Sequence, residues 1–351
     1  MLERSPPPPS LRAALERIAG GLELVERSLR DQLASPQELI GTIGEHVLSS
    51  GGKRLRPALL FLAAELCGYT GPRRVQVAAA VELLHTASLL HDDVVDLGEV
   101  RRGRPSANAI WGNSRAVLVG DFCLARASGM IVEDGDLEIS WIFANTIGLM
   151  SEGELFQLQR SFDASVTESH YYGVIERKSA ALISAASEAG AILGGVTRPE
   201  RRRLAEFGRE MGLAFQLRDD ALDYSADEQV LGKQPYTDLR EGKVTLPLLL
   251  TLKRCTSAER DAVDVVLKAA SNRACVTDPS TPDSMVRSSS MSSIHRTRTA
   301  GSGWVLAKSR PPGSSSSSMA SSTRTSAYGS YPTERRISTA PASASRSVAR
   351  E

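Results

Sequence analysis

The stretch ASLLHDDVVD, residues 87–96, joins an apolar run to three aspartates, Asp92, Asp93 and Asp96. If the segment is helical, successive residues turn by about 100°, so Asp92 and Asp96 lie about 40° apart on one face. Like charges at that spacing repel each other and weaken an isolated helix. Carboxylates kept there beside an apolar run therefore indicate a binding or catalytic role.

The same spacing returns in FQLRDDALDY, residues 215–224, where Asp219, Asp220 and Asp223 again adjoin apolar residues. A single acidic cluster is usually solvated surface, but two such copies are hard to explain in that way. Six carboxylates that face one cavity would need cations to neutralise them. Mg²⁺ prefers oxygen ligands and combines a few carboxylates with water and phosphate oxygens. The two clusters therefore predict a split magnesium clamp for a phosphorylated ligand.

Basic residues stand in four stretches at expected helix ends: GGKRLRP (51–57), EVRRGRP (99–105), ERKSAAL (176–182) and LGKQPYTDLREGKVTLP (231–247). Each one alone is more often a solvated surface charge. Their position beside glycines or acidic clusters favours phosphate binding, because glycine lets backbone N–H groups approach and arginine donates in pairs. The cations in question are Lys53, Arg54, Arg56, Arg101, Arg102, Arg104, Lys178, Lys233 and Lys243.

The composition is that of an ordinary globular protein: 351 residues, 41% hydrophobic, 24% charged, with a net charge of +1. A charge near zero argues against a general nucleic-acid binder, so we expect no nucleic-acid partner. We see no apolar run long enough to cross a bilayer and no signal core near the N-terminus. Four scattered cysteines favour reduced thiols. We therefore expect a cytoplasmic protein without a transmembrane segment.

The apolar period is helical from about residue 11 to about residue 272, and convincing alternating strands are absent. We therefore expect an all-α domain over residues 11–275 after a disordered leader of residues 1–10. Residues 276–351 contain 22 serines, 10 Lys+Arg and 4 Asp+Glu among 76 residues. Such a Ser/Arg-rich segment buries too little apolar surface to offset its chain entropy, so we expect a disordered C-terminal tail.

The ordered set GGKRLRP, LLHDDVVD with RRG, GDFCLARA, KSAAL, FQLRDDALDY and LGK…DLREGKVTLP closely resembles the trans-type polyprenyl (isoprenyl) diphosphate synthases over roughly residues 40 to 250. The resemblance implies a single large all-α bundle around a deep central cavity, of the isoprenoid synthase type. It implies a Mg²⁺-dependent prenyltransferase that condenses isopentenyl diphosphate with an allylic diphosphate in successive head-to-tail (1′-4) additions. More than one Mg²⁺ would bind with the allylic diphosphate. It also implies a homodimer.

The resemblance assigns roles to individual residues. The implied metal ligands are Asp92, Asp93, Asp96, Asp219, Asp220 and Asp223. The implied catalytic residues are Asp92, Asp96, Asp219, Arg101 and Lys178. The allylic diphosphate would contact Arg101, Lys178, Gln216, Lys233 and Lys243, and isopentenyl diphosphate would contact Lys53, Arg56, His85 and Arg102. Small Ala87 and Ser88, just before the first cluster, resemble long-chain synthases that serve quinone side chains, because a Phe or Tyr there would close the cavity.

Two positions depart from the family pattern: Tyr236 stands where glycine is usual, and Ser179 replaces a common threonine. Members of the family usually continue with further helices where this chain turns serine-rich. The tail is either a solvated, phosphorylatable segment or the product of a reading-frame slip, and we favour the slip. Losing terminal helices would expose apolar surface and lower stability.

Three other functions remain open. A class I terpene cyclase uses a similar clamp but normally lacks the GGKRLRP stretch and a second DDxxD. A non-catalytic subunit of a hetero-oligomeric synthase typically loses aspartates that this chain keeps. His85 and His91 before Asp92 also bring to mind the HD-type phosphohydrolases, but that interpretation leaves the second acidic cluster unexplained. His85 could instead be a core histidine, and we interpret His91 as a group that orients Asp92 or backbone.

Overall fold

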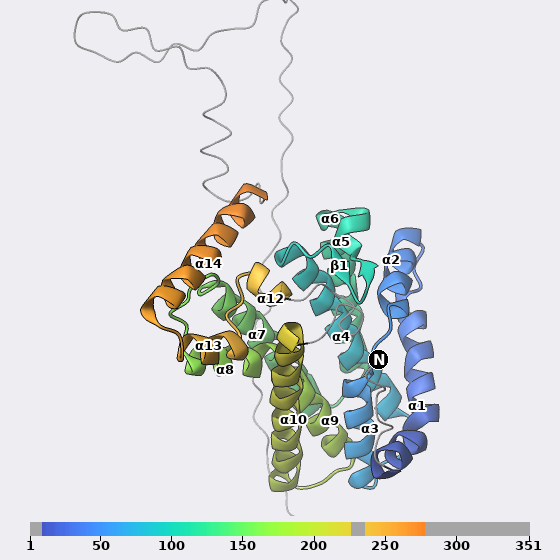
Figure 1. Ribbon diagram of the computed structural model, residues 1–351. Helices are drawn as coiled ribbons and strands as arrows, with labels where there is room; N and C mark the ends of the chain where they lie inside the picture. Colours follow the sequence, from blue (N-terminus) through green and yellow to red (C-terminus); the bar gives the residue numbers. More distant parts are fainter. Residues whose placement is uncertain (1–8, 226–235, 278–351) are drawn as a thin grey trace, which may run out of the picture. The chain divides into compact units, whose positions relative to one another are not determined.

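The structure is a computed structural model that describes residues 9–225 and 236–277, and it is helical almost throughout (Figure 1). The expected all-α class is therefore confirmed. The elements are α1 (Pro9–Leu33), α2 (Glu38–Ser49), α3 (Leu55–Leu66), α4 (Arg73–Val95), β1 (Val100–Arg101), β2 (Arg104–Pro105), α5 (Ala107–Trp111), α6 (Asn113–Asp134), α7 (Leu137–Leu158), α8 (Glu168–Ile175), the π-helical turn η1 (Glu176–Ala180), α9 (Ala181–Leu193), α10 (Arg198–Ser225), α12 (Thr237–Arg240), α13 (Leu246–Leu252) and α14 (Ser257–Thr277).

The first acidic helix, α4, lies at the centre of the bundle. It packs most extensively on α6 and also contacts α1, α3 and α9. Its run Val77–Val81 is buried on every side, as expected of a helix whose apolar residues have no polar face between them. In contrast, α1 buries only one face, through residues such as Ile18, Val25 and Leu29 at helical spacing. This packing fixes the end of α4, and with it the first acidic cluster.

The second acidic helix, α10, packs against α9, which in turn packs against α3 (Figure 1). Both glycines on the inner side of these contacts are needed for close approach. A Cβ at Gly190 of α9 would lie 2.4 Å from the Leu60 carbonyl of α3, and a Cβ at Gly208 of α10 would lie 2.8 Å from the Ile183 carbonyl of α9. The close packing of α3, α9 and α10 positions the second acidic cluster relative to the first.

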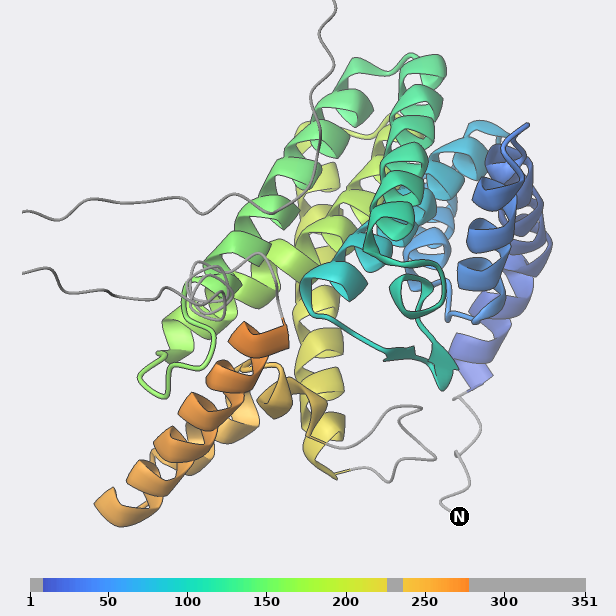
Figure 2. The same ribbon diagram turned by 90° about the horizontal axis from the view of Figure 1, so that it is seen from above.

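A short antiparallel hairpin, β1–β2, departs from the expectation that strands are absent. Val100 pairs with Pro105 and Arg101 with Arg104. The two residues between the strands, Arg102 and Gly103, both have positive φ (53° and 76°), as in the tight two-residue hairpin turns. Strands of two residues are too short to produce an alternating pattern. The hairpin lies beside the end of α2, where Arg104 donates to Ser49 Oγ at 3.0 Å (Figure 2).

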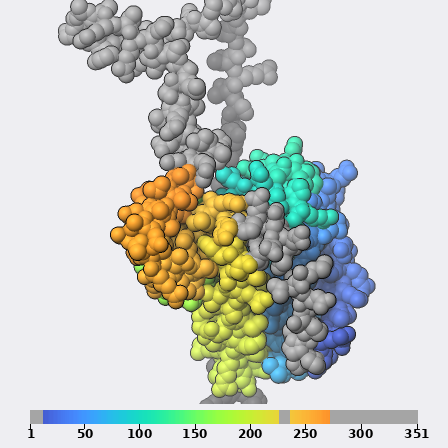
Figure 3. Space-filling view, viewed as in Figure 1, coloured from blue at the N-terminus to red at the C-terminus, as the bar shows by residue number. Residues whose placement is uncertain are grey.

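A second, smaller core lies around α8, α13 and α14. Leu267 of α14 is fully buried among residues such as Tyr171, Leu248 and Leu252. In the space-filling view α13 and α14 (orange) lie beside α10 (Figure 3). The described helical structure thus continues to Thr277, a few residues beyond the expected end near residue 272. The predictions for the leader and for the serine-rich tail fall on residues outside the described ranges, apart from the residues that α1 and α14 include.

Candidate active site

A cavity of about 1610 Å³ lies between the ends of α4 and α10, the hairpin and the segment around α12. Both acidic helices contribute to its wall. The predicted residues that line it are Asp92, Asp93, Asp96, Asp219, Asp220, Lys53, Arg56, His85, Ser88, Arg101, Arg102, Lys178, Gln216 and Lys243. Residues almost 200 positions apart in the sequence therefore meet in one space, as the deep central cavity of the prediction requires.

Two aspartates of the first cluster form ion pairs with cations that were expected to bind diphosphate. Arg101 Nε donates to Asp93 Oδ1 at 2.7 Å, and Lys243 Nζ donates to Asp96 Oδ2 at 2.6 Å. Asp96 and the neighbouring Glu241 raise the pKa of Lys243 despite its burial. These acids and bases neutralise one another.

Asp92 is less well compensated. The Lys178 ammonium lies 4.0 Å from Asp92 Oδ2 and forms its closer ion pair with Glu154 of α7. Burial raises the pKa of Asp92 to about 6, and the Glu154 and Asp96 carboxylates add to the rise, while Lys178 opposes it. A cation bound beside Asp92 would relieve this unfavourable negative charge.

A basic pocket lies on the side of the cavity next to the hairpin. Burial lowers the pKa of both Arg56 and Arg102; the Arg102 guanidinium adds to this at Arg56, and the Arg101 and Arg54 guanidinium groups add to it at Arg102. Burial, followed by Arg56 and Arg102, holds the pKa of His85 well below its usual value, so this imidazole is neutral. The buried Glu82 is engaged by Arg54, whose Nη1 donates to Glu82 Oε1 at 2.9 Å. The pocket therefore carries positive charge that an anion can neutralise.

Lys178 and Ser179 lie on η1, where the helix between α8 and α9 widens into a π-turn. Turns of this kind are rare and often occur at functional sites. Two glycines allow neighbouring helices to approach η1. A Cβ at Gly153 of α7 would lie 2.9 Å from the backbone nitrogen of Lys178, and a Cβ at Gly212 of α10 would lie 2.6 Å from Ala180 Cα. The turn is thus held from both sides, which fixes the direction of the Lys178 side chain.

The aspartates of the second cluster have different surroundings. Asp219 is exposed in the cavity, and Asp220 lines the cavity but is only 4% exposed. Tyr171 Oη donates to Asp220 Oδ2 at 2.5 Å, and Gln216 Nε2 donates to Asp220 Oδ1 at 2.7 Å. Both oxygens of Asp220 therefore accept hydrogen bonds from the protein.

Asp223 is fully buried and does not line the cavity. The Asp238 backbone N–H donates to its Oδ2 at 3.2 Å, and the Tyr236 backbone N–H donates to its carbonyl at 3.0 Å. The expectation that all six carboxylates face the cavity is therefore wrong for Asp223, because α12 begins here and its first N–H groups need acceptors. Tyr236 has φ +61°, a backbone conformation that favours glycine, which accounts for the glycine usual at this position.

With this geometry in place, the comparison with known proteins is decisive. The model of the family described as polyprenyl synthetase matches residues 37–278. The chain belongs to the polyprenyl synthetase family. The predicted family is therefore confirmed.

The relatives of this polyprenyl synthetase include enzymes named for long products. Octaprenyl diphosphate synthase of Escherichia coli (strain K12) is 42% identical over 258 residues, which cover 74% of this chain and 80% of the relative. All-trans-nonaprenyl-diphosphate synthase (geranyl-diphosphate specific) of Rhodobacter capsulatus is 41% identical over 251 residues, covering 71% and 77%. The solved structure of the polyprenyl synthase from Caulobacter crescentus CB15, complexed with calcium and isoprenyl diphosphate, superposes with a TM-score of 0.68 at 39% identity and covers 73% of this chain and 84% of that one.

Besides Asp223, three predicted residues lie away from the cavity or outside the described ranges. Lys233 falls in residues 226–235, which lie outside the described part of the chain. Ala87 is 2% exposed and belongs to the core, so of the two proposed chain-length residues only Ser88 reaches the cavity wall. His91 points towards α6, where its Nε2 lies 3.2 Å from the Val117 carbonyl and 3.3 Å from Asp121 Oδ1.

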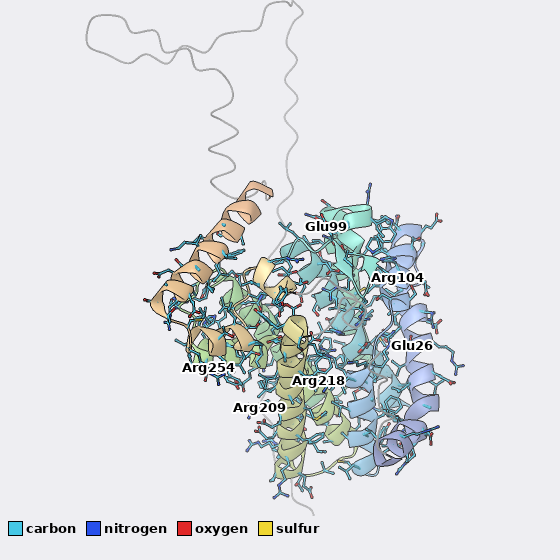
Figure 4. All side chains as sticks on the ribbon, in the orientation of Figure 1. Glu26, Glu99, Arg104, Arg209, Arg218 and Arg254 are labelled. Carbon is cyan, nitrogen blue, oxygen red and sulfur yellow. The ribbon has the colours of Figure 1, made fainter. Side chains whose placement is uncertain are left out.

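The sequence interpretation missed several polar residues around the site. Glu154 pairs with Lys178, and Tyr171 donates to Asp220. The acidic partners of Arg54 were missed as well: they are Glu82 and Glu26, which is labelled on α1 in Figure 4. Glu82 could have been found, because a single acid inside the apolar run AAAVELLHT indicates a buried partner. The sequence around Tyr171 has no comparable feature that would indicate its contact with Asp220.

The donor set fits a magnesium ion that shares its ligands with a substrate. Within residues 9–225 and 236–277, no group of three or more His, Cys, Asp or Glu is placed to hold a metal ion alone. Asp92 and Asp96 on one wall and Asp219 on the other instead offer a few carboxylate oxygens each. Mg²⁺ usually combines one or two carboxylates with water and phosphate oxygens. No helix among the described residues is both long and apolar enough to cross a membrane.

Proposed function

We propose that this polyprenyl synthetase condenses isopentenyl diphosphate with an allylic diphosphate in successive head-to-tail (1′-4) additions and releases a long all-trans polyprenyl diphosphate. The observation that carries the proposal is the cavity itself. Carboxylates of α4 and α10 line its wall together with a basic pocket that holds positive charge without a ligand. An allylic diphosphate bound with metal beside the carboxylates, and isopentenyl diphosphate bound without metal in the basic pocket, match these two parts of the cavity.

Magnesium would be held by Asp92 and Asp96 from α4 and by Asp219 from α10, with Asp93 and Asp220 beside them. The charge at Asp92, where burial raises the pKa to about 6, supports its place among the ligands. When bound, Mg²⁺ neutralises the negative charge that develops on the departing diphosphate. We expect more than one ion, because the two acidic walls belong to different helices.

The protein's own cations complete the allylic site. Lys178 lies between Glu154 and Asp92, Arg101 on Asp93 and Lys243 on Asp96. With the carboxylates engaged by metal, these three cations would hold diphosphate oxygens and stabilise the leaving group. Gln216 lines the same part of the cavity, and Lys233 is proposed for this site by resemblance alone.

Isopentenyl diphosphate would occupy the basic pocket of Lys53, Arg56 and Arg102, with neutral His85 as a hydrogen-bond partner. Lys53 Nζ lies 5.5 Å from the centre of the Phe215 ring of α10, and both residues line the cavity. This placement would hold the double bond of isopentenyl diphosphate next to the allylic carbon, so that the two reactants are already in position when the bond forms. The departing diphosphate would then be the proton acceptor, because the aspartates would be engaged with metal.

Ser88 lines the cavity one turn before Asp92, and its small side chain leaves room for a growing chain. Together with relatives named for eight and nine prenyl units, this supports a long product for quinone side chains.

We further propose a cytoplasmic homodimer. Large apolar side chains are exposed along α6 and α7, among them Leu118, Val132 and Trp141, and a second copy would cover them. The three described cysteines are free thiols, which suits a reducing compartment. A hetero-oligomer is the alternative, and sedimentation of the purified chain distinguishes the two.

The test of function is incubation with farnesyl diphosphate, radiolabelled isopentenyl diphosphate and Mg²⁺, followed by sizing of the extracted products. Label in a ladder of long prenols is the expected result. Hydrocarbon formed from the allylic substrate without label would instead identify a terpene cyclase. Absence of both products would indicate a non-catalytic subunit and contradict the proposal.

A further inference from the structure

One chain of hydrogen bonds connects three helical segments behind the second acidic cluster. Ser179 Oγ on η1 donates to Gln216 Oε1 at 2.6 Å, and Gln216 Nε2 donates to Asp220 Oδ1 at 2.7 Å. Tyr171 Oη on α8 donates to the other oxygen, Asp220 Oδ2, at 2.5 Å. The carboxylate of Asp220 is therefore held from both sides.

Tyr171 is suited to remain a hydrogen-bond donor. It is 4% exposed, and a phenol keeps its proton at neutral pH, so the hydroxyl can donate to the carboxylate. Hydrogen bonds to a charged acceptor are stronger than those between neutral groups, and here the acceptor is itself buried. Two such bonds fix the plane of the Asp220 carboxylate next to Asp219, which is exposed in the cavity.

We infer that Tyr171 is a positioning residue for the second acidic cluster, through the hydrogen bond that it donates to Asp220. It holds the Asp220 carboxylate in one orientation, so that Asp219 and Asp220 present a constant set of oxygens to magnesium diphosphate. This inference rests on the proposed function and deepens it. Partners that orient metal-binding groups in this way typically contribute 10- to 100-fold to affinity or activity.

The neighbouring Tyr172 offers a matched control. It lies on the same helix and is 38% exposed, and its ring contacts Tyr171 edge-to-face at 5.5 Å between centroids. Tyr171→Phe and Tyr172→Phe each remove one hydroxyl and keep the ring. Only the first removes the hydrogen bond to Asp220.

The test is calorimetric titration of each full-length variant with inorganic pyrophosphate in the presence of Mg²⁺. We expect Tyr171→Phe to weaken binding about 10- to 100-fold and Tyr172→Phe to stay within about twofold of the wild type. In steady state, the KM for the allylic diphosphate should rise in Tyr171→Phe, while the KM for isopentenyl diphosphate should not, because its pocket lies on the hairpin side. A general structural defect would raise both.

Pyrophosphate binding by Tyr171→Phe within about twofold of the wild type would overturn the inference, and so would a parallel rise of both KM values. In an Asp220→Asn background, Tyr171→Phe should have little further effect if the tyrosine acts through this carboxylate. If Tyr171→Phe does not fold, Ser179→Ala tests the chain from its other end, and unchanged binding there would count against it. A wild-type protein that neither forms product nor binds pyrophosphate with Mg²⁺ would refute the proposed function itself.

Discussion

Replacing Asp92 with asparagine should make the magnesium-free protein more stable while it abolishes prenyl transfer. Burial, Glu154 and Asp96 raise the pKa of Asp92 from 3.8 to about 6. At about 1.4 kcal/mol for each pKa unit, the charged carboxylate costs up to about 3 kcal/mol of folding free energy at neutral pH. Asparagine has nearly the same shape and carries no charge, so it removes this cost.

The sign of the pH dependence follows from the raised pKa. Between about pH 4 and pH 6 the folded protein keeps a proton that the unfolded chain has lost, so the free energy of unfolding falls as the pH rises through this window. The charged Asp92 carboxylate therefore does not reduce the free energy of unfolding below about pH 4, and it reduces it fully above about pH 6. The stability gained by Asp92→Asn should therefore be largest at pH 8 and close to zero near pH 4.

The neighbouring aspartate supplies the control. Asp93 accepts hydrogen bonds from Arg101 at 2.7 Å, so Asp93→Asn weakens a half-buried ion pair and should destabilise the protein by about 1–3 kcal/mol. Urea unfolding in EDTA, followed by circular dichroism at pH 4 and pH 8, measures both variants. An Asp92→Asn protein that is less stable than the wild type at pH 8, or equally changed at both pH values, would refute the reasoning.

Three further predictions concern other parts of the site. Gly120→Ala should lower the free energy of unfolding by about 1–3 kcal/mol, because its Cβ would lie 2.3 Å from His91 Nε2. A Cβ at Gly129 on the same helix meets nothing within 4 Å, so Gly129→Ala should be neutral or stabilising. Thermal unfolding of both variants checks this. Ser88→Phe should shorten the products sized by chromatography, and an unchanged ladder would show that the growing chain does not pass this residue. Arg102→Ala should raise the KM for isopentenyl diphosphate about tenfold or more with a smaller effect on the allylic substrate, and equal effects on both would remove Arg102 from the basic pocket.

The sequence allowed the acidic helices and most of the cavity to be predicted, because spacing in a helix fixes which residues share a face. Asp92 and Asp96 therefore line the cavity together, and Asp219 of α10 lines the same cavity. What spacing does not fix is which face meets a neighbouring helix. Ala87 adjoins Ser88 in the chain, but the packing around α4 buries Ala87 in the core and leaves Ser88 at the cavity.

The remaining differences come from contacts between segments far apart in the sequence. Asp223 stands at the DDxxD spacing, but its carboxylate accepts a hydrogen bond from the Asp238 backbone N–H at the start of α12. The hairpin that carries Arg101 and Arg102 is too short to show a strand pattern. Tyr171 is an aromatic residue on a helix, and only the folded structure reveals that its hydroxyl donates to Asp220 of α10.

The central claim is that the carboxylates of α4 and α10 hold one diphosphate through shared divalent ions. Anomalous diffraction from crystals grown with Mn²⁺ and inorganic pyrophosphate tests it most directly. We predict manganese peaks beside Asp92, Asp96 and Asp219 that are bridged by a single pyrophosphate. Manganese bound at only one helix, or pyrophosphate bound in the cavity without contact to metal, would contradict the account.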